Sequence, residues 1–168
     1  MKWKRNKKVI EEPIIEYLEK IFDEELAKGY KLRVSVGTDS QKSGGGSYKF
    51  ATVILITTSE DLGGAIVGRG GIIVDSIYYN SFKARNKALV NERMLYEVSK
   101  SLEVAYEIAP LLDLYGIKLE IHADINPDSK YESNKAFQSA VGYILGMGYE
   151  FKVKPDSYCA SHCADNLL

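Results

Sequence analysis

Two aspartates, each at the end of a predicted strand, are the residues best placed to do chemistry. Asp39 closes the β-branched run at residues 34–38, and Asp124 closes the apolar run at residues 121–123. A carboxylate beside a buried strand must be hydrogen-bonded, paired or bound to a metal, because an uncompensated buried charge is costly. Two such groups on neighbouring strands repel each other unless a divalent cation lies between them, and oxygen ligands favour Mg²⁺ or Mn²⁺. The alternative for either residue alone is a strand-end cap or turn former.

A long helix predicted over residues 85–109 offers further carboxylates. Its apolar stripe is formed by Met94, Val98, Leu102, Ala105 and Ala109. Glu97 lies on the border of this stripe, whereas Glu92 and Glu103 project away from it and Glu107 falls on the opposite face. A ligand supplied by a helix that packs on a sheet needs the border position, so Glu97 is the first candidate and Glu92 the second. The alternative for Glu97 is a solvated helical glutamate.

The C-terminal segment contains further candidate ligands. Asp156 suits the N-cap of a short last helix, and Asp165 lies three residues from the last one, where disorder is the usual expectation. Cys159, His162 and Cys163 raise the alternative of zinc, but a closed site would have to recruit a carboxylate or the other histidine. The small residues between them favour close packing of this helix on a sheet instead.

The elements that position these residues follow from periodicity and turn signals. We expect a helix from residue 13 that stops at Gly29, and then three antiparallel strands at residues 32–39, 48–57 and 70–79. The long helix ends at Pro110, and a strand at residues 118–124 follows. A helix over residues 130–147, a strand at residues 149–154 and a short terminal helix complete the chain. A meander followed by βαβ units predicts a mixed sheet with helices on its faces.

Composition limits the classes of protein that this chain fits. Its 168 residues are enough for one domain with a core, and 45% apolar with 27% charged residues is ordinary globular composition. A formal net charge of −1 excludes a uniformly basic nucleic-acid binder, but it allows an enzyme that holds nucleic acid through metal ions and a local basic patch. The absence of a spanning apolar run or signal peptide, with two neighbouring cysteines, predicts a cytoplasmic protein without membrane contact.

Short motifs occur in a fixed order along the chain: GTDSQ at residues 37–41, RMLYE at 93–97, HADIN at 122–126, GMG at 146–148, KPD at 154–156, and AS and AD at 160–161 and 164–165. Together they resemble the bacterial YkuK-like family of predicted ribonuclease H-related nucleases, and the similarity covers about residues 30–168. The resemblance implies a ribonuclease H-like α/β fold over residues 31–168. Its mixed five-stranded sheet would have three antiparallel strands, then parallel βαβ units, with helices on both faces. A basic arm and a helix would precede it at residues 1–30.

The resemblance also implies a site. Asp39, Glu97, Asp124 and Asp165 would be the catalytic residues and metal ligands, with Asp39 bridging two Mg²⁺ or Mn²⁺ ions, and with Glu92 and Asp156 as second choices. The chemistry would be two-metal cleavage of phosphodiester bonds. Expected partners are RNA, RNA–DNA hybrid or structured DNA. The residues that could contact phosphate are Lys42, Arg93 and Lys154.

Two other functions remain open on the sequence. A ribonuclease H-like domain can keep its fold and act only as a nucleic-acid or protein binding module, which the near-neutral charge favours. The related actin-like ATPase folds bind nucleotide phosphate with an aspartate-containing hairpin, but this chain lacks the length for their second lobe. Retention of the aspartates and of candidate helix glutamates favours the enzyme.

Overall fold

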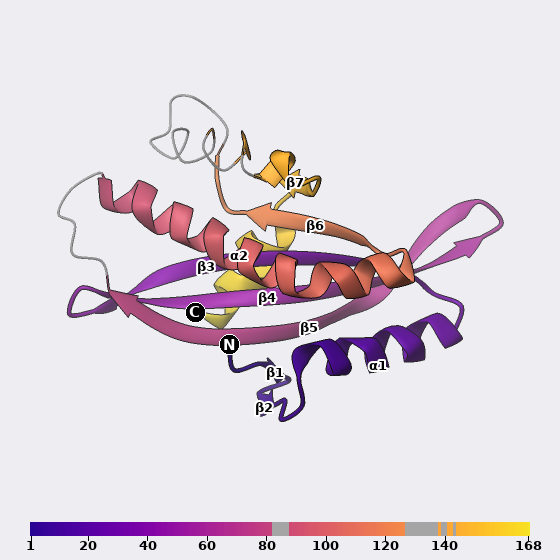
Figure 1. Cartoon of the computed structure of the whole chain (residues 1–168). Coiled ribbons are helices and arrows are strands. Elements are labelled where there is room, and N and C mark those ends of the chain that lie inside the picture. Colours follow the sequence, from indigo (N-terminus) through magenta and orange to yellow (C-terminus); the bar gives the residue numbers. More distant parts are fainter. Residues whose placement is uncertain (82–87, 127–137, 139–140, 143) are drawn as a thin grey trace.

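The computed structural model describes residues 1–81, 88–126, 138, 141–142 and 144–168. Their strands form one mixed sheet in the order β2-β1-β5-β4-β3-β6-β7 (Figure 1). The strands are β1 (Lys4–Arg5), β2 (Lys8–Val9), β3 (Lys31–Gly44), β4 (Ser47–Leu62), β5 (Ala65–Ser81), β6 (Lys118–Ala123) and β7 (Glu150–Lys152). The helices are α1 (Ile14–Ala27) and α2 (Ala88–Tyr115), followed by the short π-helical η1 (Cys159–Ala164) and the 3₁₀ turn η2 (Asp165–Leu167).

The N-terminal residues form part of the sheet, and the prediction of five strands was therefore wrong. β1 and β2 pair as an antiparallel hairpin, and β1 continues the sheet by pairing Lys4 with Asp75 of β5. Trp3 is buried, and its carbonyl accepts a hydrogen bond from the Ile10 amide at 3.0 Å. Burial of the large indole explains why this basic segment is bound to the domain, since an aromatic side chain of that size gains much from leaving water.

The predicted antiparallel meander is confirmed. β3 pairs with β4, and β4 with β5, along almost their whole lengths. β5 begins at Ala65 rather than at residue 70, because the β4–β5 hairpin continues to a tight turn at Gly63 and Gly64, both with positive φ. This end of the hairpin projects beyond the helices (Figure 1).

The parallel half of the sheet follows the predicted order. β6 pairs in parallel with β3, and β7 in parallel with β6. α2 makes the crossover from the meander to β6. The helix expected over residues 130–147 lies largely outside the described residues, although 141–142 and 144–146 are helical. The carboxyl ends of β3, β6 and β7 therefore meet along one edge of the sheet.

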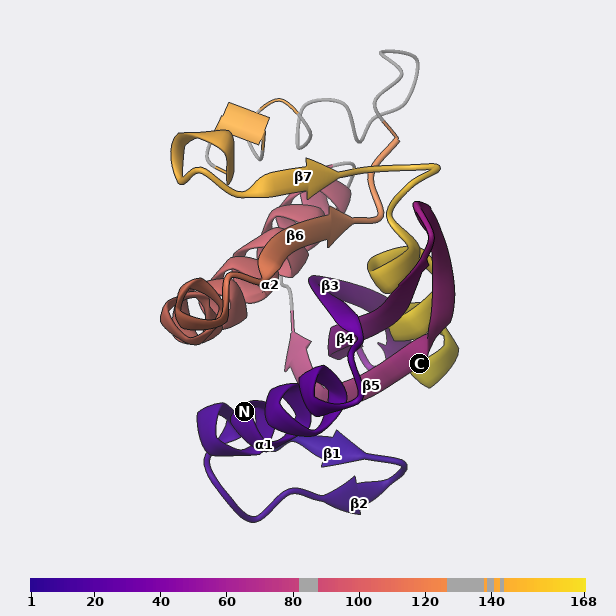
Figure 2. The same ribbon diagram turned by 90° about the vertical axis from the view of Figure 1, so that its right-hand side faces the viewer.

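Helices cover both faces of the sheet, as predicted. α1 and α2 lie on one face, where Val34, Val36 and Ile54 pack against Leu18 and Ile108. η1 lies on the other face, and Figure 2 shows it on the far side of β3, β4 and β5 from α2. Its buried cysteines pack against Ala51, Val53 and Leu55 of β4. Alternation along each strand thus decides which of the two layers a side chain meets.

α2 does not end at Pro110 as expected, but continues to Tyr115. A proline inside a helix removes the hydrogen bond to the carbonyl four residues earlier. Pro110 and Tyr106 are both exposed, so water can satisfy that carbonyl. None of the described helices is both long and apolar enough to span a membrane.

Candidate active site

Asp39 and Asp124 lie beside each other on adjacent parallel strands. Thr38 of β3 is in register with Ala123 of β6, so the next residue of each chain segment is an aspartate. Both aspartates belong to the face covered by η1. Asp39 is paired with Ala51, which packs on η1. The ring of His122 contacts the η1 backbone, and Asp124 lies two residues further along, on the same side of the chain. The predicted adjacency of the two strand ends is confirmed.

Asp39 is the electrostatic centre of the site. The pKa of its carboxyl is raised to about 6, first by its burial and then by the negative charges of Asp124 and Asp165. The Ser40 backbone amide and the Arg93 guanidinium oppose this increase. The three aspartates are therefore close enough to influence one another, although they come from sequence positions up to 126 residues apart.

Asp165 is held against β3 from the C-terminal segment. The Gln41 side-chain amide donates to Asp165 Oδ1 at 3.1 Å, and strand alternation puts Gln41 on the same face as Asp39. Lys49 Nζ donates to the carbonyl oxygens of Leu167 and Leu168, each at 2.9 Å. Disorder was the expectation for this segment, but these contacts and the packing of both leucines against β4 order it.

Glu97 approaches from α2, on the opposite face. Its side chain is 5% exposed, and Ser40 Oγ donates to Oε1 at 2.5 Å. Arg93 Nη1 lies 2.8 Å from the same Oε1, and it also contacts the Ser40 carbonyl and hydroxyl oxygens at 3.0 and 2.7 Å. The pKa of Glu97 is raised to about 8, chiefly by its burial and also by the charges of Asp39 and Asp124, while Arg93 and Ser40 act in the opposite direction. Glu92 is exposed, so the structure brings Glu97 and not Glu92 to the cluster.

Asp124 has one paired and one unpaired oxygen. Lys154 Nζ lies 3.0 Å from Oδ2. Oδ1 is buried and has no hydrogen-bond partner among the described residues. The second-choice ligand Asp156 is exposed in the turn after Lys154. It is also not the N-cap of the last helix, because η1 begins after Tyr158 without a side-chain cap.

The donor atoms of this site suit a divalent cation, but the spacing between the side chains does not. Four carboxylates act on one another electrostatically, and a buried oxygen of Asp124 lacks a partner, which is the environment that hard divalent cations stabilise. In the described part of the chain, however, no three acidic, histidine or cysteine side chains are grouped closely enough to hold a metal ion. Arg93, Lys154 and Gln41 each contact one of the carboxylates.

Gly37 and His122 position the layer that carries Asp165. A Cβ atom at Gly37 would lie 2.6 Å from the Ala160 backbone nitrogen, so only glycine allows η1 to lie this close to β3. His122 Nδ1 accepts a hydrogen bond from the Cys159 amide at 3.0 Å, and Nε2 lies 3.1 Å from Glu120 Oε2. Burial lowers the pKa of His122, and the neutral ring joins β6 to η1. His122 is thus a structural residue.

The cysteines pack in the core under the site. Cys159 Sγ lies 3.5 Å from the carbonyl oxygens of Ser35 and Val53, and burial raises the pKa of its thiol. His162 stacks on Tyr158 with ring centroids 4.9 Å apart. Among the described residues, these side chains do not form a group of three or more that could hold a metal ion.

Several residues of the site were missed by sequence reasoning. Ser40 and Gln41 belong to the GTDSQ motif, and strand alternation could have assigned Gln41 to the face of Asp39. Lys49 was expected only among the basic residues that give nucleic-acid affinity, and its contact with the C-terminal segment was missed because that contact depends on where the segment packs. Lys42 is exposed in the β3–β4 hairpin, where it is paired with Tyr48 in the strand register.

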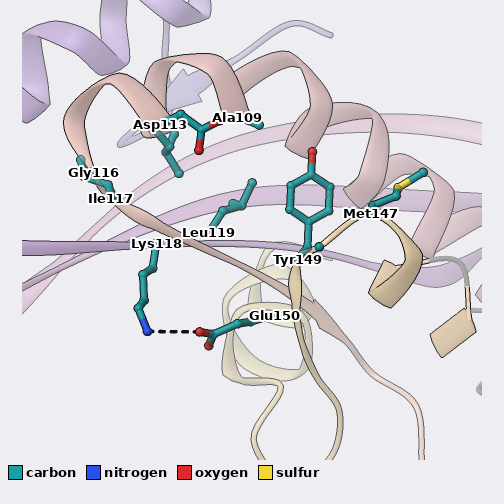
Figure 3. Close-up of a pocket in the computed structure, with 11 residues that line it drawn as sticks. Ala109, Asp113, Gly116, Ile117, Lys118, Leu119, Met147, Tyr149 and Glu150 are labelled. Atoms are coloured by element: carbon teal, nitrogen blue, oxygen red, sulfur yellow. Dashed lines mark hydrogen bonds and ion pairs between the residues drawn. The ribbon is translucent and has the colours of Figure 1, made fainter.

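A pocket of about 480 Å³ lies at the other end of β6 (Figure 3). It is formed by the end of α2, the start of β6 and the residues before β7, with Asp113, Leu119 and Tyr149 among its lining residues. Lys118 and Glu150 form an ion pair across its rim at 3.3 Å. None of the carboxylates described above lines this pocket, so it is separate from the site.

Comparison with protein-family models assigns most of the chain to a family. The model described as ribonuclease H-like matches residues 13–167. The match includes α1, which the motif-based similarity left out. No curated protein and no solved structure matches the chain.

Proposed function

The chain belongs to the ribonuclease H-like family, in agreement with the YkuK-like resemblance of its motifs, and from this premise we propose that it is a divalent-metal-dependent nuclease. Its substrate would be nucleic acid, and its reaction the hydrolysis of a phosphodiester bond. The observation that supports this most strongly is the carboxyl of Asp39. Its pKa is raised by its burial and by two further aspartates, one directly after β6 and one in η2.

Each acidic residue has a distinct place in this proposal. Asp39, Asp124 and Asp165 share one face of the sheet edge and would hold Mg²⁺ or Mn²⁺ there. Glu97 would join them from α2 once its oxygen is released by Arg93. When bound, two such ions would activate a water molecule and stabilise the leaving oxygen. The protein itself supplies the fixed acceptors, and a cation bound there would compete with protons, because the pKa values of both Asp39 and Glu97 are raised.

Arg93 is the residue best placed to bind a substrate phosphate. Its Nη1 atom is fixed by Ser40 and Glu97, and the guanidinium lies 5.7 Å from the centre of the Tyr48 ring. A guanidinium held in this way presents its remaining donors with little loss of rotamer freedom. Lys42 would add a mobile positive charge on the neighbouring hairpin.

Cleavage assays test the proposal directly. RNA–DNA hybrid, duplex RNA, structured DNA and single strands would be incubated with Mg²⁺ or Mn²⁺ and with wild type, Asp39→Asn or Asp113→Asn. Asn is nearly isosteric with Asp but lacks its charge, so Asp39→Asn should abolish divalent-dependent cleavage with the fold retained in circular dichroism. Asp113→Asn, an exposed change at the far end of α2, should leave cleavage unchanged. Equal cleavage by wild type and Asp39→Asn would point to a contaminating nuclease and refute the assignment.

A binding module without catalysis is the second candidate. It is favoured by the protein partners that Glu97, Asp124 and Asp165 already have in Arg93, Lys154 and Gln41. Salt-dependent nucleic-acid binding by the wild type, with no cleavage of any substrate in either metal, would favour this second function.

A further inference from the structure

Lys154 is fixed beside Asp124 by the backbone as well as by its charge. β6 and β7 are parallel neighbours, and both residues follow the carboxyl ends of these strands. The Lys154 amide donates to the Ile125 carbonyl at 3.2 Å, which ties the two segments together next to the ion pair. The ammonium group therefore faces Asp124 because of the sheet register and does not depend on a chance surface contact.

The two oxygens of Asp124 differ in a way that matters for a cation. Oδ2 is paired with the Lys154 ammonium at 3.0 Å, whereas Oδ1 is buried without a partner among the described residues. The Lys154 side chain is 46% exposed, so it can move away into solvent, while the Asp124 side chain is only 22% exposed. A cation that reached Oδ1 would find a positive charge already bound to the same carboxylate.

We propose that Lys154 is an internal counter-ion that competes with divalent cations for Asp124 and lowers the affinity of the site for them. This inference rests on the proposed metal-binding function of the site. Without nucleic acid, the ammonium satisfies one oxygen of Asp124 and repels a second positive charge. For a divalent ion and an ammonium about 4 Å apart in water, this repulsion corresponds to a loss of affinity of up to roughly 30-fold, which salt screening reduces.

The test measures metal affinity and not cleavage. Mn²⁺ would be titrated into wild type, Lys154→Met and Lys118→Met without nucleic acid, and the free Mn²⁺ signal followed by electron paramagnetic resonance. Lys118 is a matched control, because its ion pair with Glu150 joins the same two strands at their other ends, at 3.3 Å. We expect Lys154→Met to bind Mn²⁺ at least threefold more tightly than wild type, and Lys118→Met to stay within twofold of it.

Further variants separate charge from shape. Lys154→Arg keeps the positive charge and should bind Mn²⁺ as weakly as wild type. Lys154→Gln would replace Lys154→Met if the latter did not fold, as judged by circular dichroism. Mn²⁺ affinity of the uncharged variant equal to or below that of wild type would overturn the inference.

The outcomes also distinguish this inference from the proposed function. Wild type that cleaves nucleic acid and binds Mn²⁺ no more weakly than Lys154→Met would refute the role of Lys154 alone. Mn²⁺ binding by Lys154→Met but not by wild type would support it. No Mn²⁺ binding by any variant would refute both the counter-ion and the metal-dependent nuclease.

Discussion

Replacing Gly37 by alanine tests the close packing on which the site is built. An ideal Cβ at this position would lie 2.6 Å from the Ala160 nitrogen, and 3.0 Å from both Ala160 Cα and the Cys159 carbonyl carbon. All three atoms are backbone, so no side chain can turn away to relieve the clash. η1 would have to move from β3 by roughly 0.8 Å to restore ordinary contact distances.

Two contributions set the size of the effect. Overpacking a close interface of this kind costs about 1–3 kcal/mol. A shift of η1 also strains the buried hydrogen bond from the Cys159 amide to His122 Nδ1, whose loss costs about 1 kcal/mol. Together these give about 2–4 kcal/mol, which for a domain of this size corresponds to a fall in Tm of roughly 4–16 °C. Because η2 follows η1 directly, Asp165 would move as well, and Mn²⁺ affinity should fall.

Thermal unfolding followed by circular dichroism measures the first effect, and Mn²⁺ titration well below the Tm measures the second. Gly68→Ala is the matched control, since its Cβ would meet nothing within 4 Å in strand β5. We expect Gly68→Ala to unfold within about 1 kcal/mol of wild type. A Tm for Gly37→Ala within about 2 °C of both proteins would show that η1 does not pack on β3 in this way.

Two further predictions concern the carboxyl groups themselves. Glu97→Gln should lower Mn²⁺-dependent cleavage at least tenfold, whereas Glu92→Gln, on the exposed side of α2, should leave it unchanged. The nuclease assay described above measures both variants, and equal cleavage by the two would refute the role of Glu97. The metal-free protein should lose stability as pH rises, because the raised pKa values of Asp39 (about 6) and Glu97 (about 8) mean that the folded state holds protons that the unfolded chain has released. This contribution to stability is fully present below about pH 4 and is lost as the pH rises through 6 to 8. Urea unfolding should therefore give a smaller free energy of unfolding at pH 8 than at pH 5, and Asp39→Asn should reduce the difference. A free energy of unfolding of the wild type that rises from pH 5 to pH 8 would contradict the prediction.

The sequence by itself determined the order of the main elements and the position of two site residues. Alternation of apolar residues marked the meander and β6, and the end of each strand is a local property of the chain. Because the carboxyl ends of adjacent parallel strands meet at one edge, the positions of Asp39 and Asp124 in their strands were enough to predict that they lie together. The helical stripe of α2 was likewise enough to prefer Glu97 over Glu92.

Only the tertiary structure decided what each carboxylate contacts. Gln41 meets Asp165 across 124 positions of sequence, and Lys49 meets the carbonyls of Leu167 and Leu168 across 118 and 119. The same holds for the N-terminal hairpin, which extends the sheet because β1 pairs with the edge of β5 and the Trp3 side chain is buried in the core. Propensity and periodicity act over a few residues, whereas these contacts depend on how separate layers pack against one another.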